Sequence, residues 1–485
     1  MFPYERIIIL DKGSQVPLYR QIAISISNAI SDGTLKADAA LPSSRELAKL
    51  LGIHRKTAIA GYDELDAQGW ITIVARKQVR VAANIPIMKQ QKWDASKPIA
   101  AYEHHFDLPL STIKGHPKNE ATAPLIEVII DDGHPDVRLS PIDELLKTYR
   151  SYTSKQHAIK DAHLGTAQGT LSLRIALTKY LSETRGLNCS AEHLLITHGA
   201  QMSIYLSARL LLNTHSHIIV GKPNYQAANR TFEATGASLI EVDMDEHGID
   251  VTAIERICKA KKIDAIYVIP HHHYPTTVTL SVARRIQLLE LSQKYAFTII
   301  EDDYDYDYHY SSSPYLPLAS GHHRGNIIYI GSFSKILDPS LRIGFMVAPK
   351  NFIEAGTAFR TMIDAGGDGY MQNALAALIN AGELKRHLKK AKKTYHQRRD
   401  RLLQLLQKKL GHHVSYSIPT GGMAIWVTLN PNIPVRLLST YPRLNVIQID
   451  EAQNAFRFGF ASMEERELQA AIAMLEHIIL GYRSD

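Results

Sequence analysis

A lysine stands inside the segment SFSKILDPSLRIGF, residues 332–345, directly after a short apolar run. The run GNIIYIG (325–331) is rich in isoleucine and predicts a buried strand. Lys335 should therefore lie just past the end of a strand, where α/β folds place their chemistry. A lysine amine kept neutral by burial and nearby cations forms a Schiff base with an aldehyde, whereas a surface lysine would only be solvated. The same segment offers two hydroxyls and a guanidinium that suit a phosphate: Ser332, Ser334 and Arg342.

Two earlier segments also place polar groups after predicted strands. In ITHGAQ (196–201), Ala200 and Gln201 begin a predicted helix, and the backbone N–H groups of such a helix start favour a phosphate. In GKPNYQ (221–226), Tyr225 stands in a turn where its ring can lie flat against another aromatic ring. Either segment alone is weak evidence, and a purely structural role explains it at least as well.

Carboxylates follow another predicted strand, in IIEDDYDYDYHY (299–310). A carboxylate at the end of an apolar strand costs free energy unless it is paired, so Asp302 is well placed to hold a protonated heterocyclic nitrogen. Tyr304, two residues on, can donate to a ring oxygen. A carboxylate for a pyridinium, an amine for an aldehyde and a cradle for a phosphate together predict pyridoxal 5'-phosphate as the cofactor.

The elements that must position these groups belong to a large C-terminal domain, residues 126–485. Short apolar strands there alternate with helices, which predicts an α/β domain with a largely parallel sheet covered by helices on both faces. Residues 83–125 have no long apolar face and predict a linker. The strands expected from isoleucine-rich or apolar runs are LLIT (194–197), HIIV (217–220), AIYVI (265–269), FTII (297–300) and NIIYI (326–330).

A separate unit is predicted at residues 15–82. Apolar residues recur at helical spacing from Leu18 to Ile30, and a second helix begins near Ser43 or Ser44, either of which can cap it. Gly52 ends that helix, and another follows at once, which is the helix-turn-helix pattern. WITIVARKQVRVAA then predicts two short strands joined by a basic tip, in other words a wing.

The start of the third helix is basic and polar. A recognition helix contacts base edges and phosphates with such residues, whereas a small helical scaffold would only expose them to solvent. The residues concerned are His54, Arg55, Lys56 and Thr57.

Composition excludes several other classes of protein. The 485 residues carry a formal charge of +7, which suits an acidic partner without proving one. No apolar run approaches the roughly 20 residues that a membrane helix needs. Two cysteines, Cys189 and Cys258, without metal-type spacing, favour a reducing cytoplasm. The run HHHY (271–274) is not expected to bind a metal, because adjacent side chains of an extended segment point to opposite faces.

The N-terminal unit resembles the winged helix of GntR-type transcription regulators. The resemblance rests on PLYRQI, GTL and LPSSRELAKLLGIHRKTAIAGYDELDAQG. It implies that Ser44, Arg45 and the residues from His54 to Thr57 contact operator DNA. The family's usual glycine-containing wing tip is replaced by ARKQVR, so Arg76 and Lys77 are expected at most to contact phosphates.

The C-terminal domain resembles fold-type I aminotransferases, with a smaller C-terminal α+β subdomain. The matching segments include GTLSLRIALTKYLSETRGLNCSAEHLLITHGAQ (169–201), PHHHYPT (270–276) and FRFGFA (456–461). The closest resemblance is to the variant fused to a GntR-type domain, the MocR/GabR group of regulators. It implies a head-to-tail homodimer.

The same resemblance implies a role for each site residue. Lys335 would form the Schiff base, Asp302 would pair with the pyridine nitrogen and Tyr304 with the phenolic oxygen. Tyr225 would stack on the ring, and Arg457 would receive the carboxylate of an amino-acid effector. The phosphate would be held by Ala200, Gln201, Ser332, Ser334 and Arg342.

Three departures concern the effector pocket. A second arginine found in γ-aminobutyrate-responsive members is replaced by Ala227, the turn PTG becomes PTT at Thr277, and a common histidine is replaced by Ala424. We therefore do not expect γ-aminobutyrate itself as the effector.

The leading hypothesis is a cytoplasmic transcription regulator that binds operator DNA as a dimer. Its large domain would use pyridoxal phosphate to sense an amino acid, an amine or the cofactor itself. The alternative is an active aminotransferase with an accessory N-terminal domain, because the lysine, the aspartate and the phosphate residues are all intact.

Overall fold

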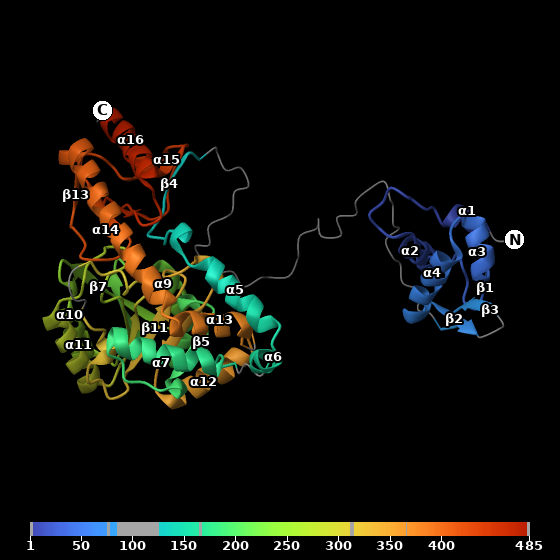
Figure 1. Cartoon of the computed structure of the whole chain (residues 1–485), viewed down its shortest axis with the longest axis horizontal. Coiled ribbons are helices and arrows are strands. Elements are labelled where there is room, and N and C mark those ends of the chain that lie inside the picture. Colours follow the sequence, from blue (N-terminus) through green and yellow to red (C-terminus); the bar gives the residue numbers. More distant parts are fainter. Residues whose placement is uncertain are drawn as a thin grey trace. The chain divides into compact units, whose positions relative to one another are not determined.

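The chain folds into two compact units, residues 1–112 and 113–485 (Figure 1). No described helix is both long and apolar enough to cross a bilayer. The predicted wing tip, Arg76 and Lys77, lies outside the described residues, as does the predicted linker from residue 85 onward. The structure is a computed structural model and describes residues 3–74, 78–84, 126–163, 167–310, 315–364 and 366–482.

The N-terminal unit packs its helices around one apolar core. Ile22, Leu47 and Leu65, one from each of the three main helices, are fully buried in it. A small antiparallel sheet with the strand order β1-β3-β2 closes the unit. The winged-helix prediction is thus confirmed for the described residues. The elements are α1 (Tyr4–Ile7), α2 (Leu18–Ser31), β1 (Ala40–Leu41), α3 (Ser44–Leu51), α4 (Arg55–Ala67), β2 (Ile71–Val74) and β3 (Gln78–Val81).

Capping residues determine where the two helices of the helix-turn-helix begin and where the first of them ends. Ser43 caps α3 in a reciprocal capping box with Glu46, and Gly52 ends it with a left-handed φ of 61°. His54 then caps α4, because its ring nitrogen Nδ1 accepts from the backbone N–H of Lys56 at 3.2 Å. The turn between the helices is therefore only three residues long.

An eight-stranded sheet forms the centre of the C-terminal unit, with the strand order β5-β12-β11-β10-β9-β6-β7-β8. The neighbours β6, β7, β9, β10 and β11 are parallel, as predicted, but β12 runs antiparallel between β5 and β11. The strands are β5 (Leu194–Thr197), β6 (His217–Lys222), β7 (Ser238–Asp245), β8 (Gly248–Ile249), β9 (Ala265–Val268), β10 (Thr298–Asp302), β11 (Ile327–Ser332) and β12 (Gly344–Val347).

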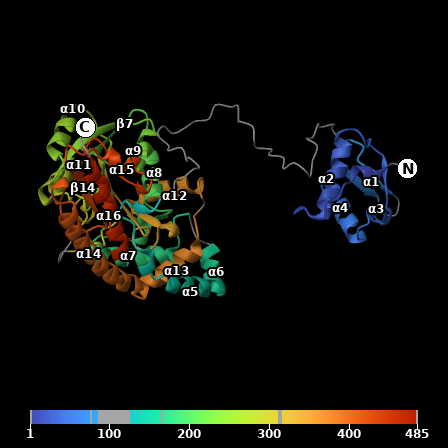
Figure 2. The same cartoon turned by 90° about the horizontal axis from the view of Figure 1, so that it is seen from above.

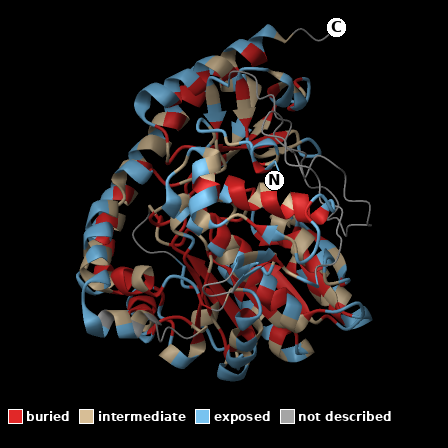
Figure 3. Cartoon of the chain, turned by 90° about the vertical axis from the view of Figure 1, so that its right-hand side faces the viewer, coloured by how far each residue is buried: buried red, intermediate tan, exposed pale blue. Residues whose placement is uncertain are grey.

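Helices cover both faces of this sheet (Figure 2). Alternate residues of each strand point to opposite faces, so Ile218 packs under α8, α9 and α12, whereas Ile219 packs under α10 and α11. The strands β9 and β11 are buried along their whole length, and β6, β10 and β12 are buried except at their ends (Figure 3). The helices are α5 (Ile142–Thr153), α6 (Gln156–His163), α7 (Leu171–Arg185), α8 (Ala200–Leu211), α9 (Gln226–Glu233), α10 (Val251–Ala260), α11 (Val282–Tyr295), α12 (Lys350–Thr361) and α13 (Gly369–Asn380).

A smaller α+β subdomain follows, as predicted. The 27-residue helix α14 begins in the core of the large sheet at Leu384 and ends in the smaller core at Leu406. The smaller core also includes an early strand, β4 (Val128–Ile130), which pairs with β15. The elements are α14 (Glu383–Lys409), β13 (Val414–Tyr416), β14 (Ala424–Leu429), α15 (Arg436–Thr440), β15 (Leu444–Val446), β16 (Ile449–Asp450), β17 (Ala455–Gly459) and α16 (Glu465–Gly481).

Candidate functional site

A cavity of about 410 Å³ opens where β10 and β11 end and α8 begins. All nine side chains or backbone positions that the sequence assigns to the cofactor line this cavity, although they come from four distant segments. They are Ala200, Gln201, Tyr225, Asp302, Tyr304, Ser332, Ser334, Lys335 and Arg342.

The lysine points its amine into this cavity. Lys335 Nζ donates a hydrogen bond to the carbonyl of Gly133 at 2.8 Å and lies 3.8 Å from Asp132 Oδ1. Burial lowers the pKa of the Lys335 ammonium, and the nearby Arg457 guanidinium acts in the same direction, while Asp132 opposes both. A larger fraction of this amine is therefore neutral, and so nucleophilic, than of a solvated lysine.

Only one of the two carboxylate oxygens of Asp302, at the end of β10, is hydrogen-bonded to a described residue. Tyr267 donates a hydrogen bond to Asp302 Oδ2 at 2.7 Å, whereas the buried Oδ1 has no partner among the described residues. Burial raises the pKa of the Asp302 carboxyl to about 7. A buried acceptor without a donor costs free energy, so this atom is suited to a donor or a cation supplied by a ligand.

The opposite end of the cavity offers hydrogen-bond groups for an anion. The helix α8 starts after Gly199 without a side-chain cap, so its first N–H groups are available. The buried Ser334 Oγ has no partner among the described residues. Arg342 lies directly over Gly199 and donates to the carbonyl of His198 at 3.1 Å. Helix N–H groups, hydroxyls and a guanidinium together suit a phosphate.

A glycine contact sets the shape of this end. Gly344 on β12 pairs with Ser332 on one side and Thr197 on the other, so it lies beneath the start of α8. A Cβ at Gly344 would come within 2.6 Å of the backbone carbon of Gly199. The strand and the helix start can approach this closely only because position 344 has no side chain.

Aromatic side chains close the remaining sides. Tyr225 lies 5.3 Å from Tyr274, ring centre to ring centre, in an edge-to-face arrangement. Tyr304 donates a hydrogen bond to the carbonyl of His272 at 2.8 Å. The predicted stacking and phenolic partners are thus both on the cavity wall.

Arg457 does not line the cavity. It is 1% exposed on β17, behind Tyr274 and Tyr304. Its guanidinium donates to the carbonyls of Asp132 and Pro275, both at 2.7 Å, and to the hydroxyl of Tyr304 at 3.0 Å. The role of Arg457 toward an effector carboxylate stays a prediction, and meeting a carboxylate would require it to exchange some of these bonds.

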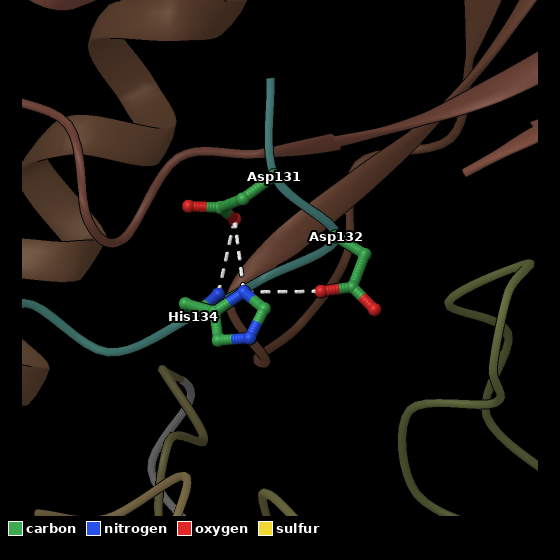
Figure 4. Close-up of side chains that lie close together, drawn as sticks. All are labelled: Asp131, Asp132 and His134. Carbon is green, nitrogen blue, oxygen red and sulfur yellow. Dashed lines mark hydrogen bonds and ion pairs between the residues drawn. The ribbon is translucent and has the colours of Figure 1, made fainter. Parts of the chain in front are cut away.

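The segment from Asp131 to His134 lines the cavity beside the lysine and was not singled out from the sequence. Ligand atoms of Asp131, Asp132 and His134 lie within 4.8 Å of one another (Figure 4). Asp131 is already engaged, because Oδ1 accepts from the N–H groups of Gly133 and His134 and Oδ2 accepts from the Ser462 hydroxyl. This group of side chains therefore shapes a turn and carries no metal assignment.

Asp132 is the member of that turn that faces the lysine. His134 Nδ1 lies 3.1 Å from Asp132 Oδ1, and Tyr274 donates to Oδ2 at 2.9 Å. Burial acts to raise the pKa of Asp132, but His134 and Lys335 outweigh it, and the pKa lies well below its usual range. An ionised carboxylate thus stands beside the amine of Lys335. Its only sequence signal was a pair of acidic residues directly after the apolar run of β4.

The departures from the regulator pattern lie in or beside this site. Thr277 adopts a φ of 62°, a left-handed conformation that glycine takes at little cost and a β-branched residue does not. Ala424 packs behind Gly133, since a Cβ added there would lie 3.3 Å from that of Ala424. The carbonyl of Ala227 accepts from the Gln201 amide at 3.4 Å.

The consecutive histidines take separate partners. His271 Nδ1 lies 3.0 Å from Asp303, His272 Nδ1 2.8 Å from Asp305, and His273 Nδ1 2.8 Å from the Thr276 hydroxyl. Burial lowers the pKa of His273 to about 3, so this ring is neutral.

In the N-terminal unit, the residues predicted to contact DNA gather at two helix starts. Ser44 and Arg45 open α3, and His54 to Thr57 open α4. Arg45, His54, Arg55 and Lys56 are exposed, whereas Ser44 and Thr57 are half-buried.

Two family models match the chain. The model described as "Aminotransferase class I and II" matches residues 140–475, and the model described as "Bacterial regulatory proteins, gntR family" matches residues 18–81. The two matches correspond to the two modules that the sequence predicts.

Similar proteins combine the same modules or share the larger one. An uncharacterized HTH-type transcriptional regulator of Bacillus subtilis, YisV, is 29% identical, and the match covers 95% of each chain. The probable rhizopine catabolism regulatory protein MocR of Rhizobium meliloti is 26% identical over 86% of this chain and 83% of its own. The crystal structure of Pyrococcus horikoshii kynurenine aminotransferase superposes with a TM-score of 0.67 at 27% identity, over 75% of this chain and 92% of its own.

Proposed function

The chain belongs to the aminotransferase class I and II family and has a GntR-family domain in front of it, and from this we propose that it senses an amino compound through pyridoxal phosphate. The two modules and the MocR-type relatives make it a GntR-family transcription regulator with an aminotransferase-like domain. For this regulator, we propose the identity of the cofactor, the class of the effector and the residues that bind them.

One observation carries it. The cavity brings together an amine, a carboxylate and an anion-binding end, and two of its buried polar atoms, Asp302 Oδ1 and Ser334 Oγ, have no partner among the described residues and face these two ends. These atoms match the ring nitrogen and the phosphate of the cofactor that the family uses. Pyridoxal phosphate supplies an aldehyde that condenses reversibly with primary amines.

Each residue of this chain then has a task. Lys335 would hold the cofactor until an amino compound replaces it, and its lowered pKa supports that exchange. Asp302 would keep the ring nitrogen protonated, and the ionised Asp132 would hold an incoming ammonium beside the cofactor. Tyr225 and Tyr304 would fix the ring.

A conformational response requires an interaction that differs between the two states. Release of Lys335 from the cofactor would be that difference. Residue 336, directly after the lysine, is held by α14, because His387 Nε2 lies 2.8 Å from the Ile336 carbonyl. Movement of the lysine segment would therefore reach the helix that joins the two cores. We propose that the response passes between partners of a head-to-tail homodimer in the cytoplasm.

The visible absorption spectrum tests this proposal. The purified protein, mixed with pyridoxal phosphate, should show a long-wavelength band that shifts with one class of amino acid or amine. A protein that stays colourless would contradict the cofactor, and a band that no amino compound shifts would contradict the sensor.

The DNA-binding half makes a separate prediction for Arg55. Replacing Arg55 with alanine should weaken binding to a selected operator duplex. If the guanidinium contacts a phosphate, the slope of log affinity against log salt concentration (the salt slope) should also become shallower by about 1. The matched control is Lys36→Ala, an exposed cation of the same unit outside both helices. Equal affinities of the parent and Arg55→Ala across a salt series would remove Arg55 from the interface.

An active aminotransferase is the second candidate. It is favoured by the complete set of cavity residues and by the likeness to the kynurenine aminotransferase structure. Steady-state transamination without binding to any selected DNA would favour this candidate over the regulator.

A further inference from the structure

The first half of α14 exposes a row of cations that the proposed function does not use. The helix contains eleven lysines and arginines and two acidic residues, an excess of nine positive charges. The whole chain has an excess of only seven, so the rest of the chain is slightly acidic. The net positive charge of this protein is thus accounted for by one helix.

The helix is amphipathic, and its cations lie on the outer side. Leu384, His387, Ala391 and Tyr395 are buried against the two cores. The exposed side of the same turns carries Lys385, Arg386, Lys389, Lys390 and Lys393. Residues three and four apart lie on one face of a helix, about 6 Å apart along its axis, so these five form a continuous strip. We refer to them as the basic strip.

The cations of the two halves of α14 differ in their ion pairing. In the second half, Arg398 pairs with Asp136 at 2.8 Å, Arg401 with Glu465 at 2.7 Å, and Lys409 with Glu476 at 3.1 Å. Within the basic strip, the one ion pair to a described residue joins Arg386 to Glu383 at 2.6 Å. The four lysines of the strip have no acidic partner among the residues that the structure describes.

This arrangement costs stability, and within the described residues the four lysines gain no ion pair that would offset the cost. Like charges at a spacing of four residues repel each other, and cations near the start of a helix oppose its dipole. Lys385 and Arg386 stand in the first turn of α14, at the unfavourable end. A strip retained at that cost is suited to an anionic partner.

We propose that the basic strip binds the phosphate backbone of double-stranded DNA beside the operator. A row of unpaired, exposed lysines matches the regular negative charge of a duplex, and lysine contacts to phosphates need no particular base sequence. The inference rests on the DNA-binding half of the proposed function, since the GntR-family domain brings DNA to this chain. It adds a second contact that lengthens the site.

The test compares two duplexes with the full chain. An operator is selected in vitro from random duplexes, and a short duplex that only covers it is compared with a long one that extends it by about two helical turns on each side. The parent should bind the long duplex roughly tenfold more tightly than the short one. The variant has Gln in place of Lys385, Lys389, Lys390 and Lys393.

The variant should bind the short duplex as the parent does and lose its preference for the long one. Four lost phosphate contacts should lower the salt slope on the long duplex by about 3 to 4. The matched control removes four exposed lysines that have acidic partners, and it should keep both the preference and the slope. The control positions are Lys222, Lys259, Lys262 and Lys294.

Three results would overturn the proposal. The variant could keep the preference for the long duplex, or the control could lose as much of it. The parent could instead bind vesicles of phosphatidylglycerol through the strip and show no preference for the long duplex, which would assign the strip to a lipid surface. If the short duplex does not bind, that result would contradict the DNA-binding role of the winged helix and not that of the basic strip.

Folding of the variant is checked by its melting temperature, which should equal or exceed that of the parent because repulsion is removed. If it does not fold, the double variant Lys389→Gln/Lys393→Gln takes its place, and about half of the loss in slope is expected.

Discussion

Replacing Lys335 with alanine is expected to abolish the covalent attachment of pyridoxal phosphate completely. Among the residues that line the cavity, Lys335 supplies the one primary amine, and its Nζ lies beside Asp132 and Gly133. Borohydride reduction should therefore fix the cofactor to the parent protein and not to the variant. Mass spectrometry of the reduced proteins measures this directly.

Noncovalent binding should survive in this variant, because the phosphate end and Asp302 are unchanged. The control is Lys222→Ala, which removes an exposed lysine paired with Glu241 on the neighbouring strand, and it should be labelled as the parent is. An adduct on Lys335→Ala equal to that of the parent would remove Lys335 from its assigned role.

Replacing Asp302 with asparagine should have the second largest effect, and the effect should depend on pH. Burial raises the pKa of Asp302 from 3.8 to about 7 in the folded protein. A carboxyl whose pKa is raised by folding stabilises the folded state below its unfolded pKa and loses that contribution as the pH rises through the folded pKa. Between pH 5 and pH 8, the cofactor-free parent should thereby lose about 2 to 3 kcal/mol that the variant does not lose.

Chemical denaturation of both cofactor-free proteins at pH 5 and pH 8 measures that difference. Glu301, whose pKa burial raises to about 8, is present in both proteins, so its contribution largely cancels. With the cofactor, Asp302→Asn should weaken binding by about 10- to 100-fold, because a charge-assisted hydrogen bond is lost. A stability difference that is the same at both pH values would contradict the raised pKa.

Much of the fold could be predicted because its signals are local. Apolar runs of four to six residues between helical segments identified β5, β6, β9, β10 and β11, and glycine and serine signals identified the two helices of the turn. That the nine positions assigned to the cofactor would line one cavity could be predicted, because parallel strands place their carboxyl ends at one edge of a sheet.

The parts that were missed depend on contacts between distant segments. The strand β12 is antiparallel and lies next to the edge strand β5, and its short sequence overlaps the lysine motif. The strand β4 belongs to the later subdomain through its pairing with β15, more than 300 residues away. The role of Asp132 beside Lys335 follows from that pairing, so periodicity alone could not reveal it.

The Gly344 contact has a consequence for how this protein can vary. Gly344 need not touch any ligand, yet even a methyl group there would press on the backbone of Gly199 and displace the start of α8. Selection at this position would therefore act on the distance between β12 and the start of α8, and not on any contact with a ligand. Alanine, harmless at most strand positions, should be as rare at position 344 among functional variants as a loss of Lys335 itself.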